Sequence, residues 1–86
     1  MNLLFFSSSF CEPCIQTRAV LEQVEHLVPA AKIVEIDVAD DNGEAERAGV
    51  RLTPTVVVLN AEHHEVFRAE GVPRVNQVLV ALAKAV

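Results

Sequence analysis

Apolar and polar residues come in blocks along the chain, and each block has the length of one strand or one helix. The first block, Asn2–Ser7, is a short apolar run that ends in three serines, which indicates a buried strand. Pro13 then suits the first turn of a helix, and Pro29 ends that helix. The apolar positions between the two prolines have roughly helical spacing: Ile15, Ala19, Val24, Leu27 and Val28.

The middle of the chain predicts a second strand, a short helix and a third strand. Apolar residues alternate with polar ones over residues 32–38, as they do in a strand. Residues 40–42 are candidate N-caps for a short helix that runs through Ala48 and ends at Gly49. The β-branched run Thr55–Leu59 indicates a buried strand.

The last third of the chain predicts a hairpin and a closing helix. After a turn at residues 60–64, the alternating segment Glu65–Glu70 suits a half-buried strand paired with the strand before it. Gly71 and Pro73 introduce the final helix. Its apolar residues form one stripe: Val75, Val78, Leu79, Leu82 and Val86.

The predicted element order is therefore βαβαββα. The first half is a βαβ unit, which requires parallel strands and a right-handed crossover. The second half is a hairpin with a covering helix. We expect an α/β fold with a four-stranded mixed sheet, flanked by three helices that lie on both of its faces.

Composition and charge narrow the possible partners. With 86 residues, of which 51% are apolar, residues 1–86 form a single domain with a modest core. The net charge of -5, without any run of Lys or Arg, argues against nucleic-acid binding. No stretch reaches the ~18 apolar residues of a membrane span, and the N-terminus lacks the basic region of a signal peptide. We expect a cytoplasmic monomer that binds neither nucleic acid nor membranes.

The two cysteines of the chain, Cys11 and Cys14, lie where the first predicted strand gives way to the first helix. Free N–H groups and the positive end of the helix dipole favour an anion there, so Cys11 loses its proton more readily. Cys14 is one turn further along and can attack a mixed disulfide formed by Cys11. The spacing favours a redox pair with an attacking and a resolving thiol.

Other interpretations of the pair stay open at this point. Half of a zinc site has the same spacing, with further ligands from His26, His63 and His64 or from carboxylates. Adjacent histidines point to opposite faces of a strand, and Pro13 suits a helix start better than a zinc knuckle, so we expect no metal. The pair could also bind an iron–sulfur cluster in a dimer, or be inert in a non-catalytic interaction domain.

A second motif lies just before the third strand. Its sequence is Gly49-Val50-Arg51-Leu52-Thr53-Pro54-Thr55. A proline directly ahead of a buried strand is unusual. A cis Thr53-Pro54 bond would explain it, because a cis bond turns the chain sharply beside the sheet.

Together these motifs resemble those of the thioredoxin family, over nearly the whole chain. The residues that carry the resemblance are Phe10-Cys11-Glu12-Pro13-Cys14, Val50-Arg51-Leu52-Thr53-Pro54-Thr55 and Gly71. The family's N-terminal strand and helix have no counterpart here. The chain is therefore similar to the trimmed, glutaredoxin-sized version, a minimal thioredoxin fold.

The resemblance implies a role for each matching residue. Cys11 attacks, Cys14 resolves, and Pro54 is cis and packs beside the disulfide. The backbone of Thr53 pairs with an extended substrate segment, and Gly71 lets the partner backbone approach. Phe10, which matches the family's Trp before the first cysteine, forms part of an apolar docking face.

The resemblance also implies an activity and partners. We expect a thiol–disulfide oxidoreductase that reduces disulfide-containing proteins, with a redox-active disulfide and no cofactor. Glutaredoxins usually carry a Gly-Gly or Gly-x-Asp segment for glutathione before the last helix. Here that segment is Glu70-Gly71-Val72-Pro73-Arg74, without an Asp. We therefore favour a thioredoxin reductase as the electron donor, with glutathione as the alternative.

Three positions depart from the family pattern. Phe5 replaces a buried Asp, and Glu35 lies where we expect a Lys. Glu35 is thus a candidate proton acceptor for Cys14, unless it simply faces solvent. Glu12 replaces a Gly, and its charge is expected to raise the Cys11 pKa slightly. The pair should be reducing. We expect a reduction potential close to that of thioredoxin itself, which is about −270 mV.

Overall fold

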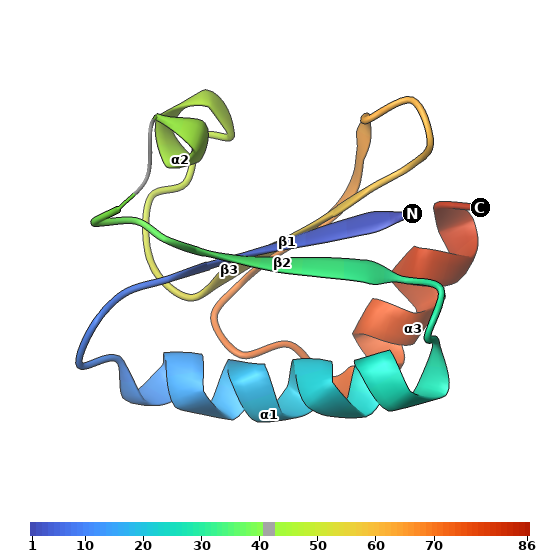
Figure 1. Cartoon of the computed structure of the whole chain (residues 1–86), viewed down its shortest axis with the longest axis horizontal. Helices are drawn as coiled ribbons and strands as arrows, with labels where there is room; N and C mark the ends of the chain where they lie inside the picture. The colour runs from blue at the N-terminus through green and yellow to red at the C-terminus, as the bar shows by residue number, and fades with distance from the viewer. Residues whose placement is uncertain (41–42) are drawn as a thin grey trace.

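The structure is a computed structural model that describes residues 1–40 and 43–86. Its elements follow the predicted order βαβαββα (Figure 1). Their bounds are β1 (Asn2–Ser7), α1 (Glu12–Leu27), β2 (Lys32–Asp37), α2 (Glu44–Arg47), β3 (Thr55–Leu59), β4 (Glu65–Glu70) and α3 (Val75–Lys84).

The four strands form one mixed sheet in the order β2-β1-β3-β4. β1 runs parallel to β2, with Phe5 opposite Glu35, and antiparallel to β3, with Phe5 opposite Val56. β3 and β4 pair as the predicted antiparallel hairpin. A helical crossover joins the parallel pair and a tight turn joins the hairpin, as each type of connection requires. The expected fold class is confirmed.

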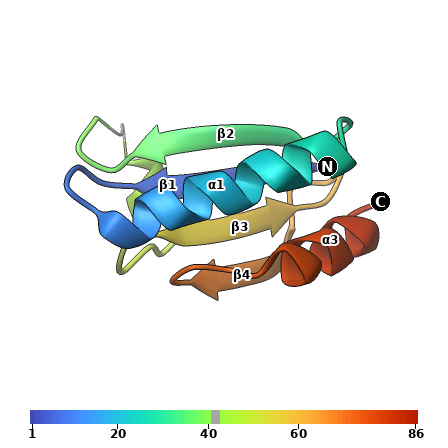
Figure 2. The same cartoon turned by 90° about the horizontal axis from the view of Figure 1, so that it is seen from below.

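The helices cover the two faces of the sheet unequally. α1 and α3 lie against each other on one face, whereas the short α2 lies on the other (Figure 1 and Figure 2). The core fills the space between the sheet and the two long helices. Its largest members are Leu3, Phe5, Leu21, Val24, Val56, Val58, Val78 and Leu82. Each contributes about 1.5–3 kcal/mol by burial, which holds α1 and α3 against the sheet.

The buried face of α1 differs from the predicted one. Ile15, Ala19 and Leu27 are exposed, so the predicted apolar stripe is wrong at these positions. The residues that α1 buries are Cys14, Thr17, Leu21 and Val24. Thr17 can be buried because its hydroxyl donates to the carbonyl oxygen of Pro13 over 2.8 Å. Apolarity alone therefore did not identify the stripe.

The short helix α2 starts differently from the prediction. Its N-cap is Gly43, with a left-handed φ of 94°, and not Asp40. The other two cap candidates, Asp41 and Asn42, lie outside the described residues. Gly49 follows the end of the helix with a φ of 69°, as expected.

The final helix α3 buries one face against the sheet and α1. Val75, Val78, Leu79 and Leu82 pack in or against the core, as predicted. Val86 is 94% exposed, because the helix ends before it, and that part of the prediction is wrong. In the described part of the chain, no helix has both the length and the apolar character needed to cross a membrane.

Candidate active site

The two cysteines form a disulfide at the junction between the β1–α1 loop and the first turn of α1. Their Cα atoms are 5.2 Å apart. Cys11 is partly exposed, whereas Cys14 is 1% exposed and belongs to the hydrophobic core. One cysteine of the pair is thus partly accessible to another molecule, and the other is almost fully buried.

Cys11 is also the residue that caps α1. Its backbone is extended, with φ −112° and ψ 100°, and Glu12 and Pro13 form the first turn after it. The backbone N–H of Cys14 donates to Cys11 Sγ over 3.1 Å. In this way the sulfur occupies the place where a Ser or Asp oxygen usually satisfies a free N–H group. An anionic sulfur is stabilised at such a position.

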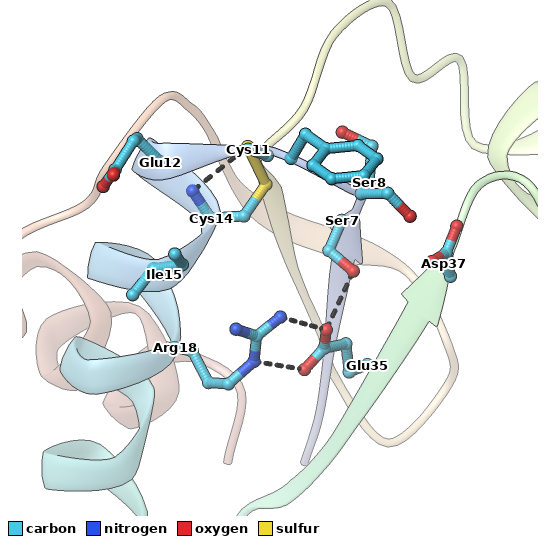
Figure 3. A pocket seen from close by; sticks show the side chains of 11 residues that line it. Ser7, Ser8, Cys11, Glu12, Cys14, Ile15, Arg18, Glu35 and Asp37 are labelled. Carbon is cyan, nitrogen blue, oxygen red and sulfur yellow. Dashed lines mark hydrogen bonds and ion pairs between the residues drawn. A yellow bond between two sulfur atoms is a disulfide. The ribbon is translucent and has the colours of Figure 1, made fainter.

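A pocket of about 550 Å³ opens beside the disulfide. Its walls come from the end of β1, the first turns of α1 and the end of β2 (Figure 3). Three charged groups besides Glu12 line it: Arg18, Glu35 and Asp37. The predicted residue Glu35 therefore shares one pocket with Cys11 and Cys14.

Glu35 is held by two neighbours in this pocket (Figure 3). The guanidinium of Arg18 donates two hydrogen bonds to its carboxylate, of 2.9 and 2.6 Å, and the buried Ser7 hydroxyl donates a third of 2.8 Å. The hydrogen bonds from Arg18 lower the pKa of Glu35, and desolvation opposes that effect. The same contact raises the pKa of Arg18, whose guanidinium lies 5.8 Å from the ring centroid of Phe5.

Arg18 and Ser7 were not among the residues predicted from the sequence. Arg18 stands four residues after Cys14, and so on the same side of α1, which is the signal that could have identified it. Ser7 is the last residue of β1, and nothing in its sequence position marks it as a partner of Glu35. The carboxylate that joins them is the same Glu35, whose side chain is 39% exposed.

The loop of Thr53 and Pro54 lies next to the loop that carries the disulfide. The Thr53-Pro54 bond is cis, as expected. The hydroxyls of Ser8 and Thr53 are 2.6 Å apart, so a hydrogen bond joins the two loops. Gly71 is held next to Pro54, because its N–H donates to the Pro54 carbonyl oxygen over 2.9 Å. Thr53, Pro54 and Gly71 are thereby brought together with the cysteine loop.

Gly71 has a φ of 99°, a conformation that side chains rarely adopt. A Cβ atom placed there would have no neighbour within 4 Å, so the conformation, and not crowding, calls for glycine. The space beside Gly71 is open.

Several apolar side chains are exposed at this end of the molecule. Phe10, directly before Cys11, is fully exposed and has a φ of 56°. Ile15 follows Cys14 and is 57% exposed. Leu52 and Val72, beside Thr53 and Gly71 in sequence, are also exposed. A role for Phe10 in docking stays a prediction.

Metal-binding side chains do not gather in the part of the chain that the structure describes: no group of three His, Cys, Asp or Glu residues is placed to hold an ion. His63 and His64 lie at the hairpin turn between β3 and β4, and His26 lies in the last turn of α1.

Comparison with known proteins agrees with this geometry. The family described as Thioredoxin matches residues 1–85 of the chain. No curated protein has a matching sequence. Among solved structures, the chain is similar to one described as a malarial protein, with 15% identity, a TM-score of 0.87, and coverage of 99% of this chain and 96% of that one.

Two solved thioredoxins are similar as well. That from Fasciola hepatica has 20% identity and a TM-score of 0.84, with 99% of this chain and 80% of that chain covered. A mutant thioredoxin from Halobacterium salinarum has 25% identity and a TM-score of 0.86, with 98% and 73% covered. The structures below 25% identity show a common fold.

Proposed function

The chain belongs to the thioredoxin family and is a thiol–disulfide oxidoreductase in the general sense, and from this premise we propose that it reduces disulfides in protein substrates by dithiol exchange. The observation that carries the proposal is the asymmetry of the pair. Cys11 is partly exposed at the helix N-terminus and accepts a hydrogen bond through its sulfur, whereas Cys14 is buried behind it.

In the reduced protein, the Cys11 thiolate attacks one sulfur of the substrate disulfide. A Cys11–substrate disulfide forms, the substrate S–S bond breaks, and the first substrate sulfur leaves as a thiolate. Cys14 then gives up its proton and attacks Cys11 Sγ. The Cys11–Cys14 disulfide forms, the second substrate sulfur leaves, and two electrons have passed to the substrate.

The substrate chain is proposed to lie between the disulfide and the loop of Thr53 and Pro54. An extended segment would pair with the backbone of Thr53, as a strand does at a sheet edge. The open space beside Gly71 and the exposed ring of Phe10 support this placement. Glu12 and Pro13 take part through the helix turn that they form between the two cysteines.

Glu35 is proposed to accept the proton of Cys14. It lines the same pocket as both cysteines, and Arg18 keeps it deprotonated, so it is ready to receive a proton at neutral pH. Because its pKa is lowered, the Glu35 carboxylate is a weak base and would hold the proton only briefly. The proton would therefore pass on quickly to water in the open pocket.

The electrons are proposed to come from a thioredoxin reductase, which would restore the two thiols after each cycle. The segment before α3 supports this donor over glutathione, since residues 70–74 contain no Asp for the glutathione amine. As part of the same proposal, the chain works as a monomer in the cytoplasm, where reductases keep thiols reduced, and needs no cofactor beyond its own disulfide.

Reduction of insulin disulfides tests the proposal. The protein is supplied in parallel with NADPH and a thioredoxin reductase, and with NADPH, glutathione and glutathione reductase. Turnover in the first mixture is the expected result, and turnover only in the second identifies a glutaredoxin-like protein. Absence of turnover in both, while the dithiol protein also fails to reduce insulin stoichiometrically, would contradict the proposed activity.

A further inference from the structure

One side-chain hydrogen bond joins the two loops of the active site directly. Ser8 Oγ and Thr53 Oγ1 are 2.6 Å apart, although 45 residues separate them in the sequence. Both side chains are partly buried. Ser8 belongs to the short loop that carries Cys11, and Thr53 directly precedes the cis proline.

The loop of Thr53 is otherwise fixed from its own side of the sheet. The hydroxyl of Thr55 donates to the Leu52 carbonyl oxygen over 2.7 Å, and the Gly71 N–H donates to the Pro54 carbonyl oxygen over 2.9 Å. These bonds hold the loop to β3 and β4. Neither of them reaches the cysteine loop.

The cysteine loop is fixed at its two ends. At one end, the Ser7 carbonyl oxygen accepts the Val38 N–H over 2.9 Å, and at the other, Cys11 begins α1. Ser9 and Phe10, which lie between these ends, are exposed. Among the hydrogen bonds of the described residues, that of the Ser8 hydroxyl sets this loop against the loop of Thr53.

We infer that Ser8 is a positioning residue for disulfide exchange: its hydrogen bond to Thr53 sets the place of the substrate-pairing backbone relative to Cys11 Sγ. The inference rests on the proposed function, since it concerns the line-up of a substrate chain. A nucleophile must be held in near-attack geometry, and a misplacement of about 1 Å can cost up to 10²-fold in rate. A small disulfide without a peptide backbone to align would not depend on this distance.

The test compares a protein disulfide, insulin, with a small disulfide, 5,5′-dithiobis(2-nitrobenzoic acid), across a small set of variants. Ser8→Ala removes the bond from one side and Thr53→Val removes it from the other while keeping the side-chain shape. Ser9→Ala, an exposed serine one position along, is the matched control. Ser8→Thr keeps the hydroxyl. Urea unfolding of each variant shows whether it is folded.

We expect Ser8→Ala and Thr53→Val each to lower kcat/KM for insulin about 3- to 10-fold, and the double variant to lose no more than either alone. The rate of the reduced protein with 5,5′-dithiobis(2-nitrobenzoic acid), a small disulfide, should stay within about twofold. Ser9→Ala and Ser8→Thr should behave as the wild type with both substrates.

Two results would overturn the inference while leaving the proposed function intact. In one, Ser8→Ala reduces insulin as fast as Ser9→Ala does. In the other, Ser8→Ala loses the same factor with both disulfides, which would place its effect on the thiol and not on substrate alignment. A wild-type protein that reduces neither disulfide would overturn both the proposed function and the inference.

Discussion

The backbone N–H of Cys14 donates a hydrogen bond to Cys11 Sγ across 3.1 Å, so one member of the pair stabilises charge on the other. The bond is directional: Cys11 receives it at the helix N-terminus, and Cys14 Sγ is buried in the core. A difference in reactivity between two chemically identical thiols thus follows from where the helix begins.

This asymmetry predicts different outcomes for the two serine variants. Cys11→Ser should lose disulfide reduction altogether, because the buried Cys14 cannot reach a protein substrate. Cys14→Ser should still attack, and it should accumulate a mixed disulfide that nothing resolves. Mass spectrometry of each variant mixed with an oxidised substrate checks both results. A mixed disulfide trapped by Cys11→Ser instead would reverse the assigned roles.

The strands and the redox pair could be predicted from the sequence, because both depend on local patterns. The β-branched run of β3 and the alternation of β4 identify strands wherever they occur. The stripe of α1 could not be predicted from apolarity, since Thr17 satisfies its hydroxyl on the Pro13 carbonyl oxygen and becomes buried. The N-cap of α2 was missed because Gly43 caps by its left-handed backbone and has no side chain to recognise.

The contacts around the pocket depend on tertiary structure. Glu35 lies 17 residues from Arg18 and 28 from Ser7, and the three meet because β2 pairs with β1 and α1 packs against the sheet. The bond of Ser8 to Thr53 spans 45 residues, and the antiparallel pairing of β1 with β3 brings these two residues together. Sequence spacing indicated which residues carry chemistry, and the sheet register determined which of them meet.

Glu12 should make the disulfide slightly more reducing. Its exposed carboxylate stands next to Cys11 in the first turn of α1, where it opposes a thiolate. Glu12→Gln should lower the Cys11 pKa by ~0.3 and raise the reduction potential by ~10 mV. Titration of thiolate absorbance and equilibration with glutathione measure the two quantities. Glu25→Gln, which removes an exposed carboxylate elsewhere on α1, should change neither, and an equal shift in both variants would contradict a local effect.

Glu35→Gln should slow the second step of exchange more than the first. The amide cannot accept the Cys14 proton, so resolution of the mixed disulfide should slow about tenfold or more at neutral pH, with Cys11 attack little changed. Stopped-flow measurement of mixed-disulfide decay across pH separates the steps. Asp37→Asn removes another carboxylate of the same pocket and is the control. An unchanged profile in Glu35→Gln would remove Glu35 from the mechanism.

The ion pair of Arg18 and Glu35 also predicts how stability depends on pH. The hydrogen bonds from Arg18 lower the pKa of Glu35 in the folded chain. A carboxyl of this kind adds stability above its unfolded pKa of about 4.3, and the addition is lost as the pH falls through the lower folded value. Both side chains are more than a third exposed, at 44% and 39%, so the effect is small.

The urea midpoint of the wild type should therefore exceed that of Glu35→Gln at pH 7, and the gap should shrink below about pH 4. Arg18→Met should show the same trend, since it removes the other half of the pair. A gap of the same size at pH 3 and pH 7 would mean that the glutamate stabilises the fold by packing and not by its charge.

Arg68 should stabilise the fold more than Arg51, which makes a surface ion pair with Glu70. Its guanidinium donates to the carbonyl oxygens of Ala48 and Gly49, which follow α2, and to the carboxylate of Glu65. The side chain is only 26% exposed, and it fastens the end of α2 to β4 on the face of the sheet opposite α1 and α3. Arg51, which pairs with Glu70 and is 77% exposed, is the natural comparison.

Arg68→Met keeps the stem of the side chain and removes the donors, so the two carbonyl oxygens lose a charged partner. We expect a loss of about 1–2 kcal/mol in the free energy of unfolding, and a clearly smaller loss for Arg51→Met, whose ion pair is screened by solvent. Arg68→Lys should recover little, since one ammonium cannot bond both carbonyls and the carboxylate at once. Urea unfolding measures all three variants. Both arginines form an ion pair, but Arg68 also bonds carbonyl oxygens. Equal losses of unfolding free energy in Arg68→Met and Arg51→Met would therefore show that the carbonyl contacts add nothing.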